Sequence, residues 1–155
     1  MPNFQSQLDY YADRQCAPQW RSFLLSLAEE LSQQLEPAEL RQLMHTLGRR
    51  MAAKLPLARA ATLEDIGASA NAIWRELNFG WVECREQEGF LQLLHYADPL
   101  LAAFGDDSDR WAPALLEGVY EEWLRRAGAD ERLRLYQQGE RGQRHQPLEF
   151  RLAAM

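Results

Sequence analysis

The three histidines are the first side chains to test for metal or acid–base chemistry. His45, His95 and His145 lie far apart in the sequence, and none has a cysteine or a pair of carboxylates at ligand spacing. A zinc site normally shows short-range ligand pairs, which this sequence lacks. His95 falls on the inward face of a predicted strand, where we expect it to form a local hydrogen bond. The histidine pattern therefore predicts no metal site.

Two acidic clusters offer carboxylates for a cation or for catalysis. Asp106-Asp-Ser-Asp109 lacks the alternate ligand positions, the glycine and the distant glutamate of a calcium loop, so we interpret it as a loop and a helix N-cap. Glu121 and Arg125 exemplify i, i+4 pairs on a helix that also carries Glu117 and Glu122, which indicates a solvated face. The sequence contains no serine elbow and no glycine-rich phosphate loop. It predicts no catalytic and no cofactor-binding residue, and therefore no enzyme.

Length and charge limit the function classes further. A chain of 155 residues is most simply one domain with a real core, and we place its start at residue 18, after an N-terminal arm over 1–17. The net charge of −6, with no Lys/Arg cluster beyond adjacent pairs, argues against a nucleic-acid binder. No apolar run approaches the ~20 residues that span a bilayer. The N-terminus has no secretory pattern, so we expect a cytoplasmic protein with two unpaired thiols, Cys16 and Cys84.

Three helices are predicted in the first half of the chain. Prolines open the first two, and their apolar residues follow helical spacing. The first stripe contains Trp20, Phe23, Leu24, Leu27, Leu31 and Leu35, and the second contains Leu40, Leu43, Met44, Leu47, Met51 and Leu55. With only about two residues between them, we expect these two helices to form an antiparallel hairpin. A capping box at Thr62 begins the third helix, which ends near Leu77.

A strand repeat follows Gly80 and predicts a β-hairpin. Strands from Trp81 and from Phe90 to Tyr96 flank the polar reversal Arg85-Glu-Gln-Glu-Gly89, and we expect Arg85 opposite Phe90. One face then carries Val82, Cys84, Leu91, Leu93 and His95. The other face carries Trp81, Phe90, Leu94 and Tyr96 among polar residues. This half-aromatic face needs a cover, so we predict that it is a self or partner interface and that the protein is a homo-oligomer.

The remaining pattern completes an α+β fold of three helices, β-hairpin, helix and β-hairpin, with the helices packed on a small antiparallel sheet. After a loop with at most one short turn, the fourth helix runs from about Asp109 or Ala112 to Arg126. Gly118 on this helix is expected to let a neighbouring backbone come close. Alternating segments at 132–136 and 148–152 predict the second hairpin. The polar loop 137–147 between them is longer than a tight hairpin needs, so it is either mobile or in contact with something.

Four motifs occur together in an order and spacing that resemble one known family. They are Pro18-Gln-Trp20, Leu47-Gly-Arg-Arg-Met-Ala-Ala53, Leu77-Asn-Phe-Gly-Trp-Val-Glu83 and Trp111-Ala-Pro-Ala-Leu-Leu-Glu-Gly-Val-Tyr-Glu-Glu-Trp123. The chain resembles the family of bacterial cellulose synthase operon protein D. The last motif is the most specific, and the C-terminal hairpin fits more loosely.

The resemblance implies a non-catalytic accessory or scaffold component of the synthase complex, a homo-oligomeric ring built as an octamer from dimers. Such a ring aids the export and ordered crystallisation of glucan chains, and its partners are other synthase subunits and β-1,4-glucan. In the family the glucan passages involve N-terminal segments, but the residues before Pro18 do not match that pattern, so no glucan-contacting residue is carried over. Phe4, Tyr10 and Tyr11 in the arm either stack on sugars or anchor the arm to a neighbouring copy. The alternative function is a small-molecule sensor or adaptor that encloses a ligand among its aromatic residues.

Overall fold

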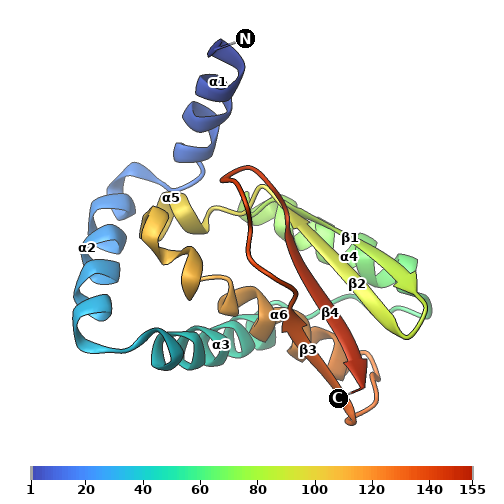
Figure 1. Ribbon diagram of the computed structural model, residues 1–155. Coiled ribbons are helices and arrows are strands. Elements are labelled where there is room, and N and C mark those ends of the chain that lie inside the picture. Colours follow the sequence, from blue (N-terminus) through green and yellow to red (C-terminus); the bar gives the residue numbers. More distant parts are fainter. Residues whose placement is uncertain (1, 155) are drawn as a thin grey trace.

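The computed structural model describes residues 2–154, which form helices packed on one antiparallel sheet (Figure 1). The described helices are α1 (Pro2–Asp13), α2 (Pro18–Gln34), α3 (Pro37–Lys54), α4 (Leu63–Leu77), α5 (Leu100–Phe104), the 3-10 helix η1 (Asp106–Arg110) and α6 (Ala114–Arg126). The described strands are β1 (Trp81–Gln87), β2 (Phe90–Tyr96), β3 (Leu133–Gln137) and β4 (Leu148–Ala154). Their order in the sheet is β1-β2-β4-β3, so the two hairpins join through β2 and β4. The predicted α+β class is confirmed.

The first two predicted helices, α2 and α3, do not form an antiparallel hairpin, so that expectation was wrong. Both residues between them are extended, with φ/ψ of −125°/145° at Leu35 and −72°/156° at Glu36. Pro37 disfavours a helical conformation at Glu36, and two extended residues carry the chain around a corner. Figure 1 shows α2 and α3 as two arms meeting at this corner, with α5 on the inner side of α2. Each arm therefore packs on a later helix, α2 on α5 and α3 on α6.

Two glycines allow α3 and α6 to pack with their backbones in contact. A Cβ atom at Gly118 would lie 2.1 Å from the His45 carbonyl oxygen, and one at Gly48 would lie 2.0 Å from the Leu115 carbonyl oxygen. The close backbone approach predicted for Gly118 is confirmed. Gly48 is its counterpart on the facing helix, and the sequence reasoning did not identify it.

The acidic residues of α6 face α3 and do not form the solvated face that we expected. Glu117 pairs with Arg41, Glu121 lies 3.3 Å from His45, and Glu122 lies 3.5 Å from Arg49. Glu122 is buried and binds Arg125 and Arg126 of its own helix. Desolvation alone would raise the pKa of Glu122, but hydrogen bonds from these two arginines lower it. The helix pair is therefore joined by backbone contact and by a row of charges.

The first hairpin has a tighter turn than predicted. Gln87, not Arg85, lies opposite Phe90, so the register differs from the prediction by two residues and the turn consists of Glu88 and Gly89. A shift of two residues leaves every side chain on its predicted face, because alternate residues of a strand share a face. Val82, Leu93 and His95 are accordingly buried.

One face of the sheet forms the core against α4 and α6. The second hairpin contributes inward residues as predicted, with Leu135, Leu148, Phe150 and Leu152 buried and Leu133 packed at the edge. Trp74 of α4 and Trp123 of α6 fill the space behind the sheet. The opposite face of the sheet carries the half-buried or exposed aromatic residues of the first hairpin.

The segment before α6 contains two short helices, α5 and η1, where the sequence predicted a loop with at most one short turn. Asp106–Arg110 forms η1, whose Ser108 is buried and donates a hydrogen bond to the Gly105 carbonyl. The acidic cluster does not cap α6, because α6 begins at Ala114 with Pro113 as its N-cap residue. The N-cap interpretation of this cluster was therefore wrong. Asp109 instead forms an ion pair with the 137–147 loop.

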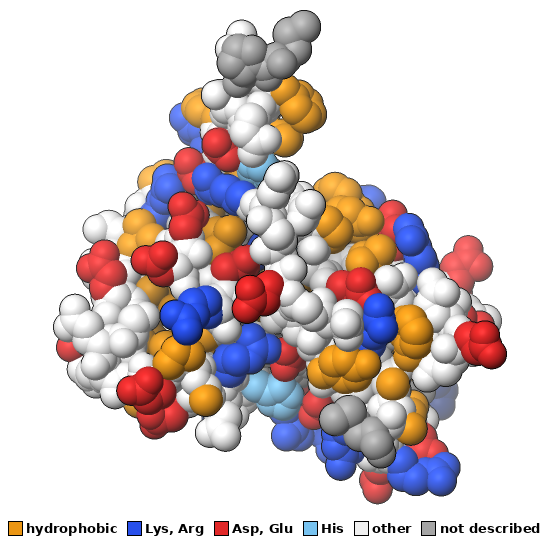
Figure 2. All heavy atoms as spheres, viewed as in Figure 1, with side chains coloured by type: hydrophobic (Ala, Val, Ile, Leu, Met, Phe, Trp, Pro, Cys, Tyr) orange, Lys and Arg blue, Asp and Glu red, His pale blue; other side chains and the backbone are white. Residues whose placement is uncertain are grey.

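The N-terminal segment forms helix α1, which projects from the body of the molecule (Figures 1 and 2). Thr62 caps α4 through a 3.1 Å bond from the Asp65 amide, as predicted. Cys16 and Cys84 are free, which confirms that they are unpaired. Within residues 2–154, no helix has both the length and the apolar character needed to cross a membrane.

Candidate functional site

The three histidines occupy three different environments. His45 lies on α3 beside Glu121, His95 is buried in the core, and His145 lies beside Asp9 of α1. Across residues 2–154, no three His, Cys, Asp or Glu side chains come together in a way that could hold a metal ion.

His95 belongs to a chain of hydrogen bonds in the core. Its Nε2 lies 2.8 Å from the Phe79 carbonyl oxygen, which can only accept, so Nε2 carries the proton. Its Nδ1 then accepts from the Tyr120 hydroxyl at 2.5 Å, and Trp74 Nε1 donates to that hydroxyl at 3.0 Å. Burial lowers the pKa of His95 to about 4 and raises that of Tyr120. All three side chains are neutral and satisfied, so this cluster stabilises the core.

The open face of the first hairpin carries a stacked aromatic pair. Trp81 and Tyr96 are directly opposed in the β1–β2 register, and their ring centroids lie 5.3 Å apart at 11° between planes. Trp81 begins β1 and Tyr96 ends β2, so the pair lies at the end of the sheet nearest to α1. Half of the Trp81 surface is exposed to solvent. The pair offers a flat apolar surface beside open space.

A groove of about 560 Å³ lies between this aromatic pair and α1. Tyr11 and Leu8 contribute to its wall from α1, and Arg14 and Gln15 contribute from the turn that follows α1. Gln15 Nε2 donates to the Ala97 carbonyl oxygen at 2.6 Å, which ties this turn to the end of β2. Aromatic rings and polar groups thus line the same space.

Arg141 from the 137–147 loop forms the buried end of the groove. Its guanidinium binds Asp98 at 2.6 Å and Asp109 at 2.7 Å, and the side chains of Arg141 and Asp98 are almost inaccessible to solvent. Burial disfavours the charged guanidinium, but the bonds to Asp109 and Asp98 more than offset this effect, so the pKa of Arg141 is raised. This ion triad fixes the loop to the segment that links β2 to α6.

The same loop also holds α1. Arg144 pairs with Asp13, and His145 Nε2 lies 2.7 Å from Asp9 Oδ1. Asp13 is shared with Arg21 of α2 at 3.4 Å. These half-exposed ion pairs position α1 over the groove. Of the two alternatives left open for the loop, the structure supports contact.

Three of the seven residues predicted as an interface meet in this groove: Tyr11, Trp81 and Tyr96. Phe90 and Leu94 lie on the same sheet face beyond it, with Arg151 stacked over the Phe90 ring at 4.3 Å. Phe4 and Tyr10 are exposed on α1 outside the groove. Sequence reasoning missed the charged residues of the groove, Asp98, Arg141, Arg144 and His145. The available signal was the i, i+4 spacing of Asp9 and Asp13 on a helix, opposite a basic loop.

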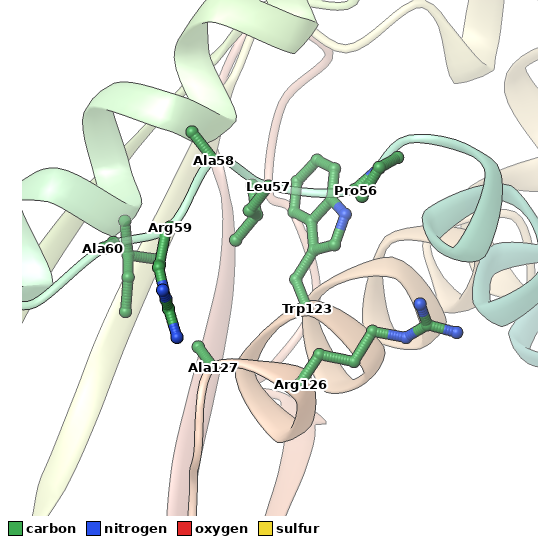
Figure 3. A pocket seen from close by; sticks show the side chains of 9 residues that line it. Pro56, Leu57, Ala58, Arg59, Ala60, Trp123, Arg126 and Ala127 are labelled. Atoms are coloured by element: carbon green, nitrogen blue, oxygen red, sulfur yellow. The ribbon is translucent and has the colours of Figure 1, made fainter.

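A second cavity of about 410 Å³ lies between the segment that precedes α4 and the C-terminal end of α6 (Figure 3). Trp123 Nε1 donates to the Leu55 carbonyl oxygen at 2.8 Å, so its indole is already fixed from inside the protein. Figure 3 shows Arg59 directed toward Ala127, whereas Arg126 points away from it. This cavity lacks convergent polar groups, and the groove beside α1 is therefore the candidate site.

Comparison with known proteins relates the chain to one family. A family model that describes the D subunit of cellulose synthase matches residues 6–151. Two relatives from Komagataeibacter xylinus, each named cellulose synthase operon protein D, are 28% and 26% identical over 109 residues. Each alignment covers 69% of this chain and 70% of the relative.

Proposed function

The chain belongs to the family of the cellulose synthase D subunit, and from this we propose that it is a non-catalytic scaffold that guides glucan chains during export and crystallisation. Membership of the family implies an accessory role in cellulose synthesis. The proposed assembly is a cytoplasmic homo-oligomeric ring, an octamer built from dimers, that contacts other components of the synthase. The single observation that carries the guiding role is the groove with the stacked Trp81–Tyr96 pair.

The groove suits a β-1,4-glucan better than a compact metabolite. Pyranose rings present apolar faces that stack on aromatic side chains, while their equatorial hydroxyls need hydrogen-bonding partners. Trp81 and Tyr96 supply the first requirement, and Asn78, Gln15 and Arg144 supply the second. The sensor alternative requires a ligand enclosed among aromatic residues. The core aromatics Trp74, Trp123 and Phe150 are instead packed together, and the groove lies at the surface.

Calorimetric titration with cellohexaose tests the groove directly. We expect Trp81→Ala to weaken binding about five- to tenfold, because a stacking contact is worth about 1–1.5 kcal/mol. Phe90→Ala is the matched control, since Phe90 lies on the same sheet face outside the groove. Equal affinities for wild type and Trp81→Ala would refute the assignment of the groove.

Loss of the protein tests the scaffold role. A scaffold acts by holding exit points in register, so its removal should disorder the product more than it stops synthesis. We expect a deletion strain to retain near-normal synthase activity in isolated membranes while it secretes less, or less ordered, cellulose. Abolished synthase activity in those membranes, or glucan hydrolysis or transfer by the purified protein, would overturn the non-catalytic proposal.

A further inference from the structure

Helix α2 exposes an apolar stripe that residues 2–154 leave uncovered. Trp20 and Phe23 are 55% and 57% exposed, Leu27 is 38% exposed, and the two aromatic rings touch edge to face with centroids 6.1 Å apart. The other side of the helix, with buried Ala28, packs on α5. Adjacent large apolar side chains in water are typical of an interface. Helix α2 is therefore covered on the side that faces α5 but not on the side that carries this stripe.

Helix α3 exposes a second stripe with a basic border. Leu47 is 43% exposed, and Leu43 and Met51 are half-buried on the same side of the helix. Arg50 and Lys54 lie beside this stripe, both exposed, and neither forms an ion pair within residues 2–154. The outer end of α3 therefore presents these two cations next to apolar surface.

The two stripes face the same side of the corner that α2 and α3 form. Exposed Leu27 immediately precedes buried Ala28, and exposed Leu47 immediately precedes buried Gly48. One residue is ~100° of helical rotation, so each stripe is offset from its buried side in the same sense. Both buried sides point to the inside of the corner, where α5 and α6 lie (Figure 1). Because the chain runs through the corner in one direction, both stripes emerge on one side of the plane of the two helices.

We propose that a second copy of this chain covers this surface, with α2 of each copy lying antiparallel on α3 of the other. The proposal rests on the homo-oligomer proposed above and specifies one of its interfaces. A two-fold axis parallel to the bisector of the corner exchanges the two arms and turns their exposed faces toward each other. Since α2 runs toward the corner and α3 runs away from it, the paired helices are antiparallel.

The residue types favour this pairing over the two alternatives, α2 on α2 and α3 on α3. Counted in residues from Glu36 at the corner, Leu47 at 11 falls between Leu27 at 9 and Phe23 at 13 of the partner copy. Arg50 at 14 falls beside Phe23, and Trp20 at 16 falls between Arg50 and Lys54 at 18. Cations over aromatic faces attract by about 0.5–2 kcal/mol each. Pairing α3 with α3 would instead place neither cation over an aromatic ring of α2. Pairing α2 with α3 therefore gives the exposed side chains of both stripes a contact in the partner copy.

The size of the surface agrees with a specific but moderate interface. Helices of 17 and 18 residues are each about 26 Å long, and stripes about 10 Å wide on both helices of both copies cover ~1,000 Å² in total. This area is at the lower limit for a specific interface. We call this proposed interface between α2 of one copy and α3 of the other the seam. It should dissociate on dilution, or when one substitution places like charges opposite each other.

Light scattering on charge variants tests the seam. Phe23→Lys places a cation against Arg50 of the partner, and we expect the particle mass to fall by a factor of about two or more. Adding Arg50→Glu to the same chain should restore the wild-type mass, because each new lysine then meets a carboxylate. Leu77→Lys, at a comparably exposed site at the end of α4, is the control and should leave the mass unchanged.

The outcomes separate this inference from the oligomer proposal. A monomeric wild type would overturn both. An oligomeric wild type with an unaffected Phe23→Lys variant would overturn the seam alone, and a dissociated variant that Arg50→Glu does not restore would overturn the α2–α3 pairing.

Cross-linking provides a second measurement that does not depend on dissociation. A mixture of Leu27→Cys and Leu47→Cys chains should form disulfide-linked dimers under mild oxidation, whereas neither chain alone should. Cys84 should contribute little background, since burial raises its pKa to about 11 and Cys16 is buried. Equal cross-linking in the single-variant samples and the mixture would contradict the pairing.

Discussion

Replacing Gly118 by alanine tests whether backbone contact between α3 and α6 holds the helical half of the fold together. The added methyl group would lie 2.1 Å from the His45 carbonyl oxygen, 2.9 Å from its carbon and 3.0 Å from the Arg49 nitrogen. All three atoms belong to the backbone of the facing helix, so no side chain can rotate away. To reach an ordinary contact of about 3.4 Å, the two helices must separate by roughly 1 Å.

The expected cost follows from this separation. Overpacking costs about 1–3 kcal/mol even where side chains can adjust, and the charge pairs Arg41–Glu117 and Arg49–Glu122 would lengthen as well. Alanine gains about 1 kcal/mol of helix propensity over glycine, which offsets part of the loss. We expect a net loss of about 2 kcal/mol, which lowers the melting temperature by ~4–8 °C for a chain of this length.

Thermal unfolding followed by circular dichroism measures this effect against a matched glycine. Gly67 is also helical, but a Cβ atom there would meet only Cys84 Sγ at 3.7 Å, so Gly67→Ala should be neutral or stabilising. Gly48→Ala, aimed at the Leu115 carbonyl from the other helix, should match Gly118→Ala. A melting temperature for Gly118→Ala equal to or above that of the wild type would refute the argument.

Three further predictions concern the core and the groove. The pKa of His95 is about 4 in the folded protein against 6.5 in the unfolded chain, so neutral His95 should contribute about 3 kcal/mol to the free energy of unfolding above pH 6.5. This contribution should be lost as the pH falls to 4. Urea unfolding as a function of pH should show the decline, and His95→Gln should reduce it. Tyr120→Phe should cost about 2–4 kcal/mol in the same assay, because it leaves both His95 Nδ1 and Trp74 Nε1 buried without partners. Arg144→Ala should accelerate proteolysis near residues 14–17 without lowering the melting temperature by more than a few degrees, whereas Arg132→Ala, at an exposed ion pair, should change neither.

Sequence periodicity predicted most helices and strands because their ends and their buried faces depend on residues that are close together in the sequence. Pro18 and Pro37 begin helices, Thr62 caps one, and strict alternation identifies the strands that contain Leu135 and Phe150. The predicted β1–β2 register was wrong by two residues, yet the predicted faces were correct. Alternation along a strand determines which side chains share a face, whereas the register also depends on the length of the turn.

Only half of the candidate site could be predicted, because the rest of it joins residues that are far apart in the sequence. Trp81 and Tyr96 are joined by a local hairpin, so their pairing follows from alternation. The triad of Asp98, Asp109 and Arg141 joins segments that no local rule relates, and each residue alone resembles ordinary loop polarity. The loop length was the usable signal, since a polar loop too long for its hairpin must contact something or move.

The corner between α2 and α3 shows what a hydrophobic stripe can and cannot predict. The spacing of Trp20, Phe23 and Leu27 indicates that this side of the helix needs an apolar cover, but it does not indicate which chain provides that cover. An antiparallel hairpin with α3 was the natural inference from a two-residue link, and the extended conformation at Leu35 prevents it. In the proposed seam the same two stripes still meet in antiparallel fashion, but between copies. The spacing of the stripes would then have identified the correct helix pair, and the link between the helices would have determined that the pair forms across two molecules.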